Sequence, residues 1–256
     1  MSLPPLLERL GTVASTNDTI AQRMRDGAPH GTAVYADAQT AGRGRRGRRW
    51  FSPPGHNLYL SVGLRVPGVR AHVGRLPLAA GVAVAELLAA DAGLRPGLKW
   101  PNDVRVEGRK IAGILCEGVS HPGLEDVVVV GIGLNLNTPP DAFPEPLRDR
   151  VTSVRAETGS PCDLPTWAAK LRTQVLDACD TAIRRPSKAR ASWCRWDETI
   201  GRRVEVELAG VWREGRAVDV LEGGPLVIDI DGEETVVFGG SIRLDGERPL
   251  PRLDPT

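Results

Sequence analysis

Runs of alternating or continuous apolar residues predict the strands of this chain. Two such runs, Thr32–Asp37 and Asn57–Val62, lie on either side of an arginine-rich segment. Lys110–Glu117 is apolar after its first residue, and a turn at residues 107–108 predicts that it forms a hairpin with the strand before it. Val127–Val130 is a continuous β-branched run, typical of a central strand covered on both faces. The pattern predicts a sheet assembled from widely separated segments.

Apolar residues at helical spacing predict helices between and after these strands. A capping-box pattern predicts a helix with Ser15 as its N-cap and with the Ser15 hydroxyl bonded to the backbone. A long amphipathic helix is expected from about His72 to Ala92, and a second from Asp163 to Arg184. A helical segment, Ser187–Trp196, follows. Helices thus alternate with strands over most of the chain.

The pattern changes after residue 199, where short alternating strands separated by glycine-containing turns replace the helices. Such spacing predicts a small β-barrel of about 45 residues, which is too small for a large core of its own and should pack on the main domain. The strands are expected at Val204–Leu208, Arg216–Val220, Leu226–Ile230 and Glu234–Phe238. We therefore expect a main domain at 1–198, a barrel domain at 199–246 and a tail at 247–256.

Composition excludes several classes of protein. The 256 residues are 41% hydrophobic, and 33 Lys plus Arg against 32 Asp plus Glu give a net charge of +1, without the excess positive charge of most nucleic-acid binders. The longest apolar stretch, Leu76–Ala90, is interrupted by Pro77, Gly81 and Glu86, so we expect no membrane partner and a cytoplasmic protein. The four cysteines show no C-x-x-C spacing, which gives no indication of a thiolate metal site or a disulfide framework.

Positive charge is concentrated in one segment, Gln39–Trp50, whose glycines at 42, 44 and 47 fit the pattern G-x-G-x-x-G. A dinucleotide fingerprint must open a helix, and the prolines at 53 and 54 prevent one here, so the glycines belong to a loop. Guanidinium groups bind phosphate or carboxylate with two hydrogen bonds, and glycine hinges permit closure. We expect a lid, more mobile without ligand, that closes over a small anion. A nucleic-acid patch is the alternative, and the balanced net charge disfavours it.

Other polar residues have ordinary structural explanations when each is taken alone. Thr16 and Asn17 follow a helix start, Asn102 and Asp103 follow Pro101 in a turn, and Lys110 begins a strand. The two glycines of the central strand, Gly131 and Gly133, weaken it, which indicates that another group approaches the backbone there.

Taken together these segments resemble the catalytic core of the biotin protein ligases. The resemblance covers most of the chain and rests on five motifs in the family's order: Ser15-Thr16-Asn17, Gly42-Arg43-Gly44-Arg45-Arg46-Gly47, Lys99-Trp100-Pro101-Asn102-Asp103, Lys110-Ile111-Ala112-Gly113-Ile114-Leu115 and Gly131-Ile132-Gly133-Leu134-Asn135. It implies an α+β fold related to class II aminoacyl-tRNA synthetases, with helices on one side of a mixed sheet and an SH3-like β-barrel at the C-terminal end. Only 14 residues precede Ser15, so we expect a short form without the DNA-binding helix-turn-helix of the repressor members, and no specific DNA binding.

The resemblance also implies a reaction in two steps. The carboxylate of biotin attacks the α-phosphate of ATP in the presence of Mg²⁺ and gives biotinyl-5′-AMP. A lysine of a biotin carboxyl carrier domain, part of a biotin-dependent carboxylase, then displaces AMP.

The residues that match the family's motifs receive roles by this resemblance, supported by the need for cations around reacting anions. Lys110, Arg45 and Arg43 are expected to be catalytic, with Lys110 on the oxygens shared by carboxylate and α-phosphate. Biotin is expected to contact Ser15, Thr16, Asn17, Gln39, Gly42, Arg43, Lys110, Gly113, Gly131 and Gly133. ATP is expected to contact Arg45, Arg46, Arg48, Trp50, Asn102, Lys110 and Asn135, with Trp50 over the adenine. Asp103 is the candidate Mg²⁺ ligand, because hard cations take oxygen ligands.

Two alternatives remain at this stage. A lipoate–protein ligase or related acyltransferase shares the core fold, and would need a long apolar tunnel in place of polar partners for a ureido ring. An RNA-binding protein could combine an arginine-rich loop with a barrel that stacks bases. Aromatic residues are only 4% of the chain, and the barrel segment contains just Trp212 and Phe238, which disfavours a stacking surface.

Overall fold

The computed structural model describes residues 6–119, 122, 124 and 126–247. Its centre is a seven-stranded mixed sheet in the order β1-β2-β3-β7-β6-β5-β4. The strands are β1 Leu7–Val13, β2 Ala33–Gln39, β3 Leu58–Arg65, β4 Pro96–Lys99, β5 Asp103–Val106, β6 Arg109–Gly118 and β7 Val127–Leu134. The edge strand β1 runs parallel to β2, and every other neighbouring pair is antiparallel. The predicted central position of the valine run is confirmed, because β7 is the fourth of the seven strands.

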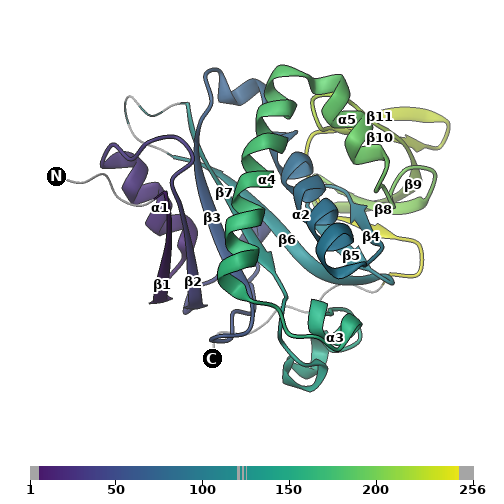
Figure 1. Ribbon diagram of the computed structural model, residues 1–256. Helices are drawn as coiled ribbons and strands as arrows, with labels where there is room; N and C mark the ends of the chain where they lie inside the picture. The colour runs from purple at the N-terminus through teal and green to yellow at the C-terminus, as the bar shows by residue number, and fades with distance from the viewer. Residues whose placement is uncertain (1–5, 120–121, 123, 125, 248–256) are drawn as a thin grey trace.

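Helices cover both faces of this sheet. On one face α2 (Leu76–Ala92) lies against the sheet, and α4 (Leu164–Arg184) and α5 (Pro186–Cys194) pack beside it, as Figure 1 shows for α2 and α4. A separate apolar cluster lies on the other face, where Ile20 and Met24 of α1 (Thr16–Arg25) pack against valines of β2 and β7. The expectation of helices on one side only is therefore wrong: the first helix takes the opposite face, beside β1 and β2.

The predicted helix at 72–92 exists but differs in two respects. It begins at Leu76, after a short 3₁₀ turn at Val69–Ala71, and it ends at Gly93, whose φ of 65° is the left-handed conformation of a helix C-cap. It is not amphipathic, because α2 is buried along most of its length between the sheet and the neighbouring helices. The other predicted helices lie within a few residues of their expected bounds, and the small helix α3 (Val154–Thr158) was not predicted.

The C-terminal segment forms a separate five-stranded antiparallel sheet in the order β11-β10-β9-β8-β12, beside α5 in Figure 1. Its strands are β8 Arg203–Leu208, β9 Val211–Val220, β10 Leu226–Ile230, β11 Glu233–Val237 and β12 Ile242–Leu244. The four expected strands are all present, and β9 is longer than predicted. The prediction missed β12, which has three residues, and the edge strand β1, which is only partly buried.

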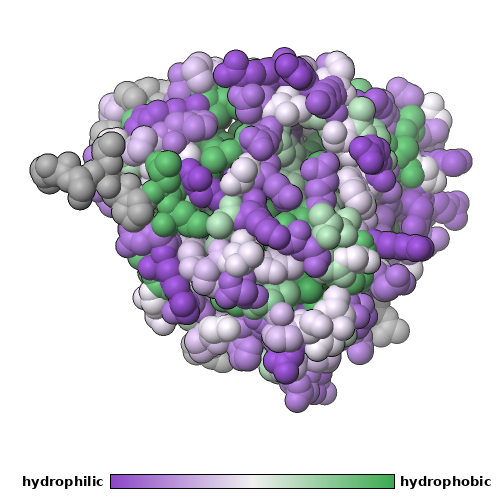
Figure 2. All heavy atoms as spheres, viewed as in Figure 1, coloured by the Kyte–Doolittle hydropathy of each residue, from purple (hydrophilic) through white to green (hydrophobic). Residues whose placement is uncertain are grey.

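Hydrophilic side chains prevail on the face that α4 crosses, with hydrophobic ones scattered between them (Figure 2). Among the helices of the described residues, none combines the length and the apolar character that crossing a membrane requires.

Candidate active site

A cavity of about 440 Å³ lies against the central strands, at positions where glycine residues leave room for it. Val127 and Val129 of β7 pack under α1, and the next positions on the same face are Gly131 and Gly133, which line the cavity. Gly133 is paired with Gly113 of β6, so two glycines lie side by side across the strands. We call these three glycines the floor of the cavity.

Side chains approach the floor as closely as its glycines permit. A Cβ at Gly131 would lie 2.1 Å from Asn17 Oδ1, and a Cβ at Gly133 would lie 2.3 Å from the ring of Trp50. The predicted approach to the backbone of β7 is confirmed, and the approaching groups are these two side chains. Trp50 also lies over Gly113, and Lys110 Nζ is 5.3 Å from the centre of its ring. The indole N–H of Trp50 is buried and has no hydrogen-bond partner among the described residues.

The arginine-rich loop covers the cavity and folds back on itself. Arg43 and Arg49 form an isolated antiparallel bridge, and Gly44 N donates to Arg48 O at 2.6 Å. Between them Arg45–Gly47 form a single 3₁₀ turn. Gly42 does not line the cavity, although it was predicted to bind ligand. It is a packing glycine, since a Cβ there would meet Ser52 Oγ at 2.7 Å.

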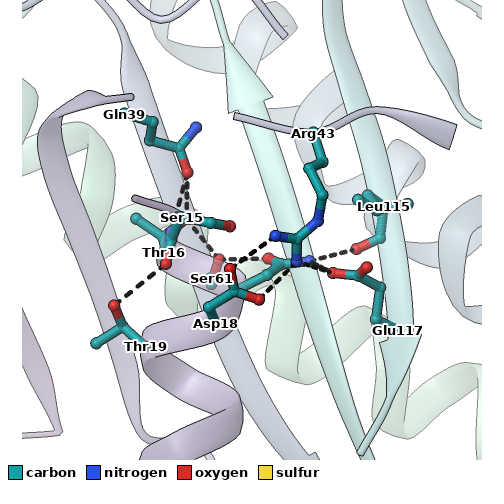
Figure 3. A network of polar contacts seen from close by, with 10 residues as sticks. Ser15, Thr16, Asp18, Thr19, Gln39, Arg43, Ser61, Leu115 and Glu117 are labelled. Atoms are coloured by element: carbon teal, nitrogen blue, oxygen red, sulfur yellow. Dashed lines mark hydrogen bonds and ion pairs between the residues drawn. The ribbon is translucent and has the colours of Figure 1, made fainter. Parts of the chain in front are cut away.

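Five residues at one end of the cavity form a connected network of hydrogen bonds (Figure 3). Gln39 Oε1 accepts from Thr16 N at 2.9 Å and lies 3.1 Å from Thr16 Oγ1. Ser61 Oγ lies 2.7 Å from Thr16 Oγ1 and 2.6 Å from Asn17 Oδ1. The amide of Asn17 donates to Glu117 Oε2 at 2.6 Å. We call Ser15 and these five residues the polar end of the cavity.

Ser15 precedes the first residue of α1, as predicted, but its hydroxyl does not cap the helix. The N–H group of Thr16 is bonded to Gln39 instead. The Ser15 side chain is buried, lines the cavity and has no hydrogen-bond partner among the described residues. Ser15 therefore holds the N-cap position, but the predicted bond from its hydroxyl to the helix backbone is absent, and Gln39 of β2 accepts the first N–H group of the helix instead.

Two carboxylates hold Arg43 above the polar end. Its guanidinium bonds to both oxygens of Asp18 at 2.7 Å and to Glu117 at 3.2 Å. The hydrogen bond to Arg43 lowers the pKa of Asp18, and the same bond raises the pKa of Arg43. Figure 3 shows that Arg43 joins the loop to α1 and β6. Arg43 is thus engaged by the protein itself, and its side chain closes the polar end.

Charged residues gather at the other end of the cavity. Lys110 Nζ bonds to Asp103 Oδ1 at 2.5 Å, Lys99 pairs with Glu247, and Arg45 donates to Asn102 Oδ1 at 3.1 Å. We call Lys99, Asp103, Lys110 and Arg45 the cationic end.

Burial and charge compete at this end. Burial acts to raise the pKa of Asp103, but the neighbouring Lys110, Lys99 and Arg45 outweigh it and hold that pKa below its ordinary value. Burial lowers the pKa of Lys99 and of Arg45. Lys99 also pairs with Glu247, so three cations face two carboxylates, and an incoming phosphate would supply the missing negative charge.

The remaining loop arginines point to different partners. Arg46 bonds to Glu207 and, at 3.1 Å, to Ser241 Oγ of the C-terminal sheet, whereas Arg48 is exposed. Segments of that sheet and of the turn after it line the cavity beside the cationic end, among them Trp212 and Arg243. The C-terminal sheet therefore contributes directly to the site.

With the exception of Gly42, the structure brings every predicted site residue to this one cavity. Asn102 also donates to Ile114 O at 2.8 Å, and buried Asn135 donates to Thr152 O at 2.9 Å, so both have structural partners. Sequence reasoning missed Ser61 and Glu117. Ser61 lies between apolar neighbours inside β3 and Glu117 follows an apolar run in β6, and these interruptions were the available signal.

The described residues contain no group of three or more His, Cys, Asp or Glu side chains that could hold a metal ion. Asp103 is a lone carboxylate with an oxygen already bonded to Lys110. Mg²⁺ is ordinarily bound by one or two carboxylates together with substrate phosphates. The described residues alone do not form a complete magnesium site at Asp103, and the assignment of Asp103 as a Mg²⁺ ligand stays a prediction.

A hydrogen-bonding end of mainly uncharged side chains, a glycine floor and a cluster of cations in one cavity define a class of site. It suits a protein that holds a small polar molecule against an anionic one, under a loop that can cover both.

Comparison with known proteins identifies the family. Residues 10–135 match the profile of the Biotin/lipoate A/B protein ligase family. The biotin–[acetyl-CoA-carboxylase] ligase of Mycobacterium tuberculosis is 37% identical over 249 residues, which cover 92% of this chain and 88% of that protein. The bifunctional ligase/repressor BirA of Bacillus spizizenii is 39% identical over 151 residues, but this match covers 59% of this chain and only 46% of the relative.

A solved structure agrees with these relatives. The biotin protein ligase of Aquifex aeolicus, in complex with biotin and ATP, matches with a TM-score of 0.78 and 29% identity, over 93% of this chain and 99% of that one. The chain belongs to the biotin/lipoate A/B protein ligase family, on the side of the biotin protein ligases.

Proposed function

We propose that this protein is an ATP-dependent ligase that activates biotin as biotinyl-5′-AMP and transfers it to a lysine of a biotin carboxyl carrier domain. The observation that carries the proposal is the continuity of the cavity. Four residues of the polar end, Ser15, Thr16, Asn17 and Gln39, line one space with the cationic end over a shared glycine floor, so a molecule held at the first end presents its far end to the second.

The polar end supports recognition of a cyclic urea. The free hydroxyl of Ser15 and the network around Thr16 and Gln39 offer hydrogen bonds to a small polar ring, and the glycine floor offers a dry wall to an apolar chain. Biotin has both parts in this order, a ureido ring and an aliphatic tail that ends in a carboxylate.

The cationic end supports adenylation. A carboxylate oxygen attacks the α-phosphorus of ATP, and pyrophosphate leaves as the bond to the bridging oxygen breaks. Lys110 lies between the floor and Asp103, where its ammonium group can contact oxygens of both reactants. Mg²⁺ enters as the complex with ATP. The amine of the acceptor lysine then attacks the carbonyl carbon, AMP leaves and the nitrogen loses a proton.

Finer features of the fold belong to the proposal. We infer that the large sheet is of the class II aminoacyl-tRNA synthetase type and that the five-stranded sheet is an SH3-like barrel, with domain boundaries at 198 and 246. The cytoplasmic location and the absence of specific DNA binding remain predictions.

The test is ATP–pyrophosphate exchange with purified protein. Exchange should depend on biotin, and a biotin carboxyl carrier domain should become labelled in the presence of ATP. Exchange with lipoate and not with biotin would contradict the proposal and indicate a lipoate–protein ligase. Exchange with neither, together with salt-resistant RNA binding, would favour the RNA-binding alternative.

A further inference from the structure

At the polar end, the number of close oxygen–oxygen contacts exceeds by one the number of hydroxyl protons available to form hydrogen bonds in them. A chain of oxygen contacts runs from Gln39 Oε1 to Thr16 Oγ1 (3.1 Å), on to Ser61 Oγ (2.7 Å) and then to Asn17 Oδ1 (2.6 Å). Its two terminal atoms are amide oxygens, which only accept, and its two hydroxyls have one proton each. Three contacts therefore share two protons, and one contact has none.

Neighbouring groups fix both terminal amides. Asn17 Nδ2 faces Glu117 Oε2 at 2.6 Å and Leu115 O at 3.4 Å, so a reversed amide would place its oxygen against a carboxylate. Gln39 Oε1 already accepts the N–H of Thr16, and Gln39 Nε2 donates to Ser52 Oγ at 3.1 Å. Both ends of the chain are therefore acceptors.

The distances decide which contact has no proton. Contacts of 2.6 and 2.7 Å are those of O–H···O hydrogen bonds, whereas 3.1 Å exceeds their usual range of about 2.5–3.0 Å. Ser61 thus donates to Asn17, and Thr16 donates to Ser61. The proton of the Thr16 hydroxyl points away from the cavity, and its lone pairs remain for a ligand.

We propose that Glu117 is a positioning residue that, through Asn17 and Ser61, sets Thr16 as a hydrogen-bond acceptor and so selects a ligand ring that presents an N–H group there. The inference rests on the proposed function, since the ring held at this end is then the ureido ring of biotin. Ser15 Oγ has no partner among the described residues and supplies the complementary donor for the ring carbonyl. Arg43 bonds to the same oxygen of Glu117, which keeps the carboxylate facing Asn17.

The experiment compares biotin with its two cyclic-carbamate analogues, in which one ring N–H or the other is replaced by oxygen. The quantity measured is the ratio of the KM values of analogue and biotin in pyrophosphate exchange. For the analogue whose oxygen faces Thr16, two acceptors meet and a hydrogen bond is lost, so the wild-type ratio should be about tenfold or more.

Four variants test the chain. Glu117→Met removes the acceptor and keeps the length of the side chain, which lets the Asn17 amide reverse, and Ser61→Ala breaks the chain at its middle. In both, Thr16 can donate, so the ratio should fall below about threefold. Glu117→Gln keeps an oxygen for Asn17 and should restore the wild-type ratio. Asp91→Asn is the control, because it removes a charge from a pair with Lys170 that does not contact the polar end, and its ratio should stay that of the wild type.

Several results would overturn the inference. These are a wild-type ratio near one, an unchanged ratio in both Glu117→Met and Ser61→Ala, or a Glu117→Gln variant that discriminates no better than Glu117→Met. Each leaves the proposed function intact if the wild-type protein shows biotin-dependent exchange. Absence of that exchange would instead reject the proposed function.

Discussion

The two ends of the cavity are built in different ways. Residues on α1, β2, β3 and β6 supply the polar end, and hydrogen bonds between these regular elements hold it together with the ion pairs of Arg43. The cationic end lies where β4, β5 and β6 begin or end, with Arg45 on the loop and Glu247 near the C-terminal end of the described chain. One end is set by the fold, and the other is an excess of positive charge held by ion pairs. On the proposed function, the polar end serves to select the ligand, and the cationic end serves the reaction of its carboxylate.

Lys110→Ala is the sharpest way to separate the two ends. A charge-assisted hydrogen bond to a reacting oxygen is worth about 1.5–3 kcal/mol, so single-turnover adenylation should slow about 10- to 150-fold. Biotin binding, measured by calorimetry without ATP, should change far less because the polar end is untouched. Lys170→Ala, which removes a lysine from an exposed pair with Asp91 on the far helix layer, is the control and should leave the rate unchanged. A normal rate in Lys110→Ala would reduce this lysine to a structural partner of Asp103.

Neutralising Arg45 and Arg46 together tests whether the loop retains the product of the first step. Biotinyl-5′-AMP should dissociate at least about tenfold faster, since each lost contact to phosphate is worth about 1–3 kcal/mol. Biotin affinity should fall less, because Ser15, Thr16 and Gln39 stay in place. Arg46 also bonds to Glu207, so the single variants should differ, with Arg45→Ala weakening retention more.

Hydrogen exchange across residues 42–47 gives the second measurement on the loop. Protection should increase when biotinyl-5′-AMP binds, if the loop orders over the adenylate. Equal protection with and without the adenylate, or wild-type retention in the double variant, would rule out a closing loop.

Gly133→Ala tests the floor that the two ends share. The added methyl group would lie 2.3 Å from the Trp50 ring and 2.4 Å from its indole nitrogen, so the ring must move. Overpacking of this kind costs about 1–3 kcal/mol, which urea unfolding should detect as a lower midpoint with an unchanged slope. Gly118→Ala is the control, because a Cβ there meets nothing within 4 Å, and it should be close to neutral. Equal stability of the two variants would mean that Trp50 adapts freely.

The glycine floor and the arginine-rich loop could be predicted from the sequence because their patterns are local. Gly131 and Gly133 interrupt a valine run at a spacing of two, which fixes them on one face of a strand and indicates a close approach. It did not identify Trp50 and Asn17 as the approaching groups, since these depend on pairing between distant segments. The ion pair between Lys99 and Glu247 joins residues that are 148 positions apart in the sequence, and no local pattern predicts it. Ser15 was predicted as a capping side chain from the local sequence pattern, and the local pattern does not show that its hydroxyl lines a cavity instead.

The smallest expected effect concerns the pH dependence of stability at the cationic end. Folding lowers the pKa of Asp103 below its ordinary value of 3.8, because Lys110, Lys99 and Arg45 outweigh the effect of burial. Between the two values the unfolded chain binds more protons than the folded one, so stability rises with pH there. The contribution of this carboxyl is fully present above pH 3.8 and is lost as the pH falls through the lower, folded value.

Asp103→Asn should therefore flatten the dependence of the urea midpoint on pH below about 4, and should leave uncompensated positive charge that weakens the protein at neutral pH. Asp180→Asn, in an exposed pair with Arg184, should change neither quantity. If the urea midpoint of Asp103→Asn depends on pH below about 4 in the same way as that of the wild type, then Lys110, Lys99 and Arg45 do not stabilise this carboxylate in solution. The account of the cationic end as an excess of positive charge would then be wrong.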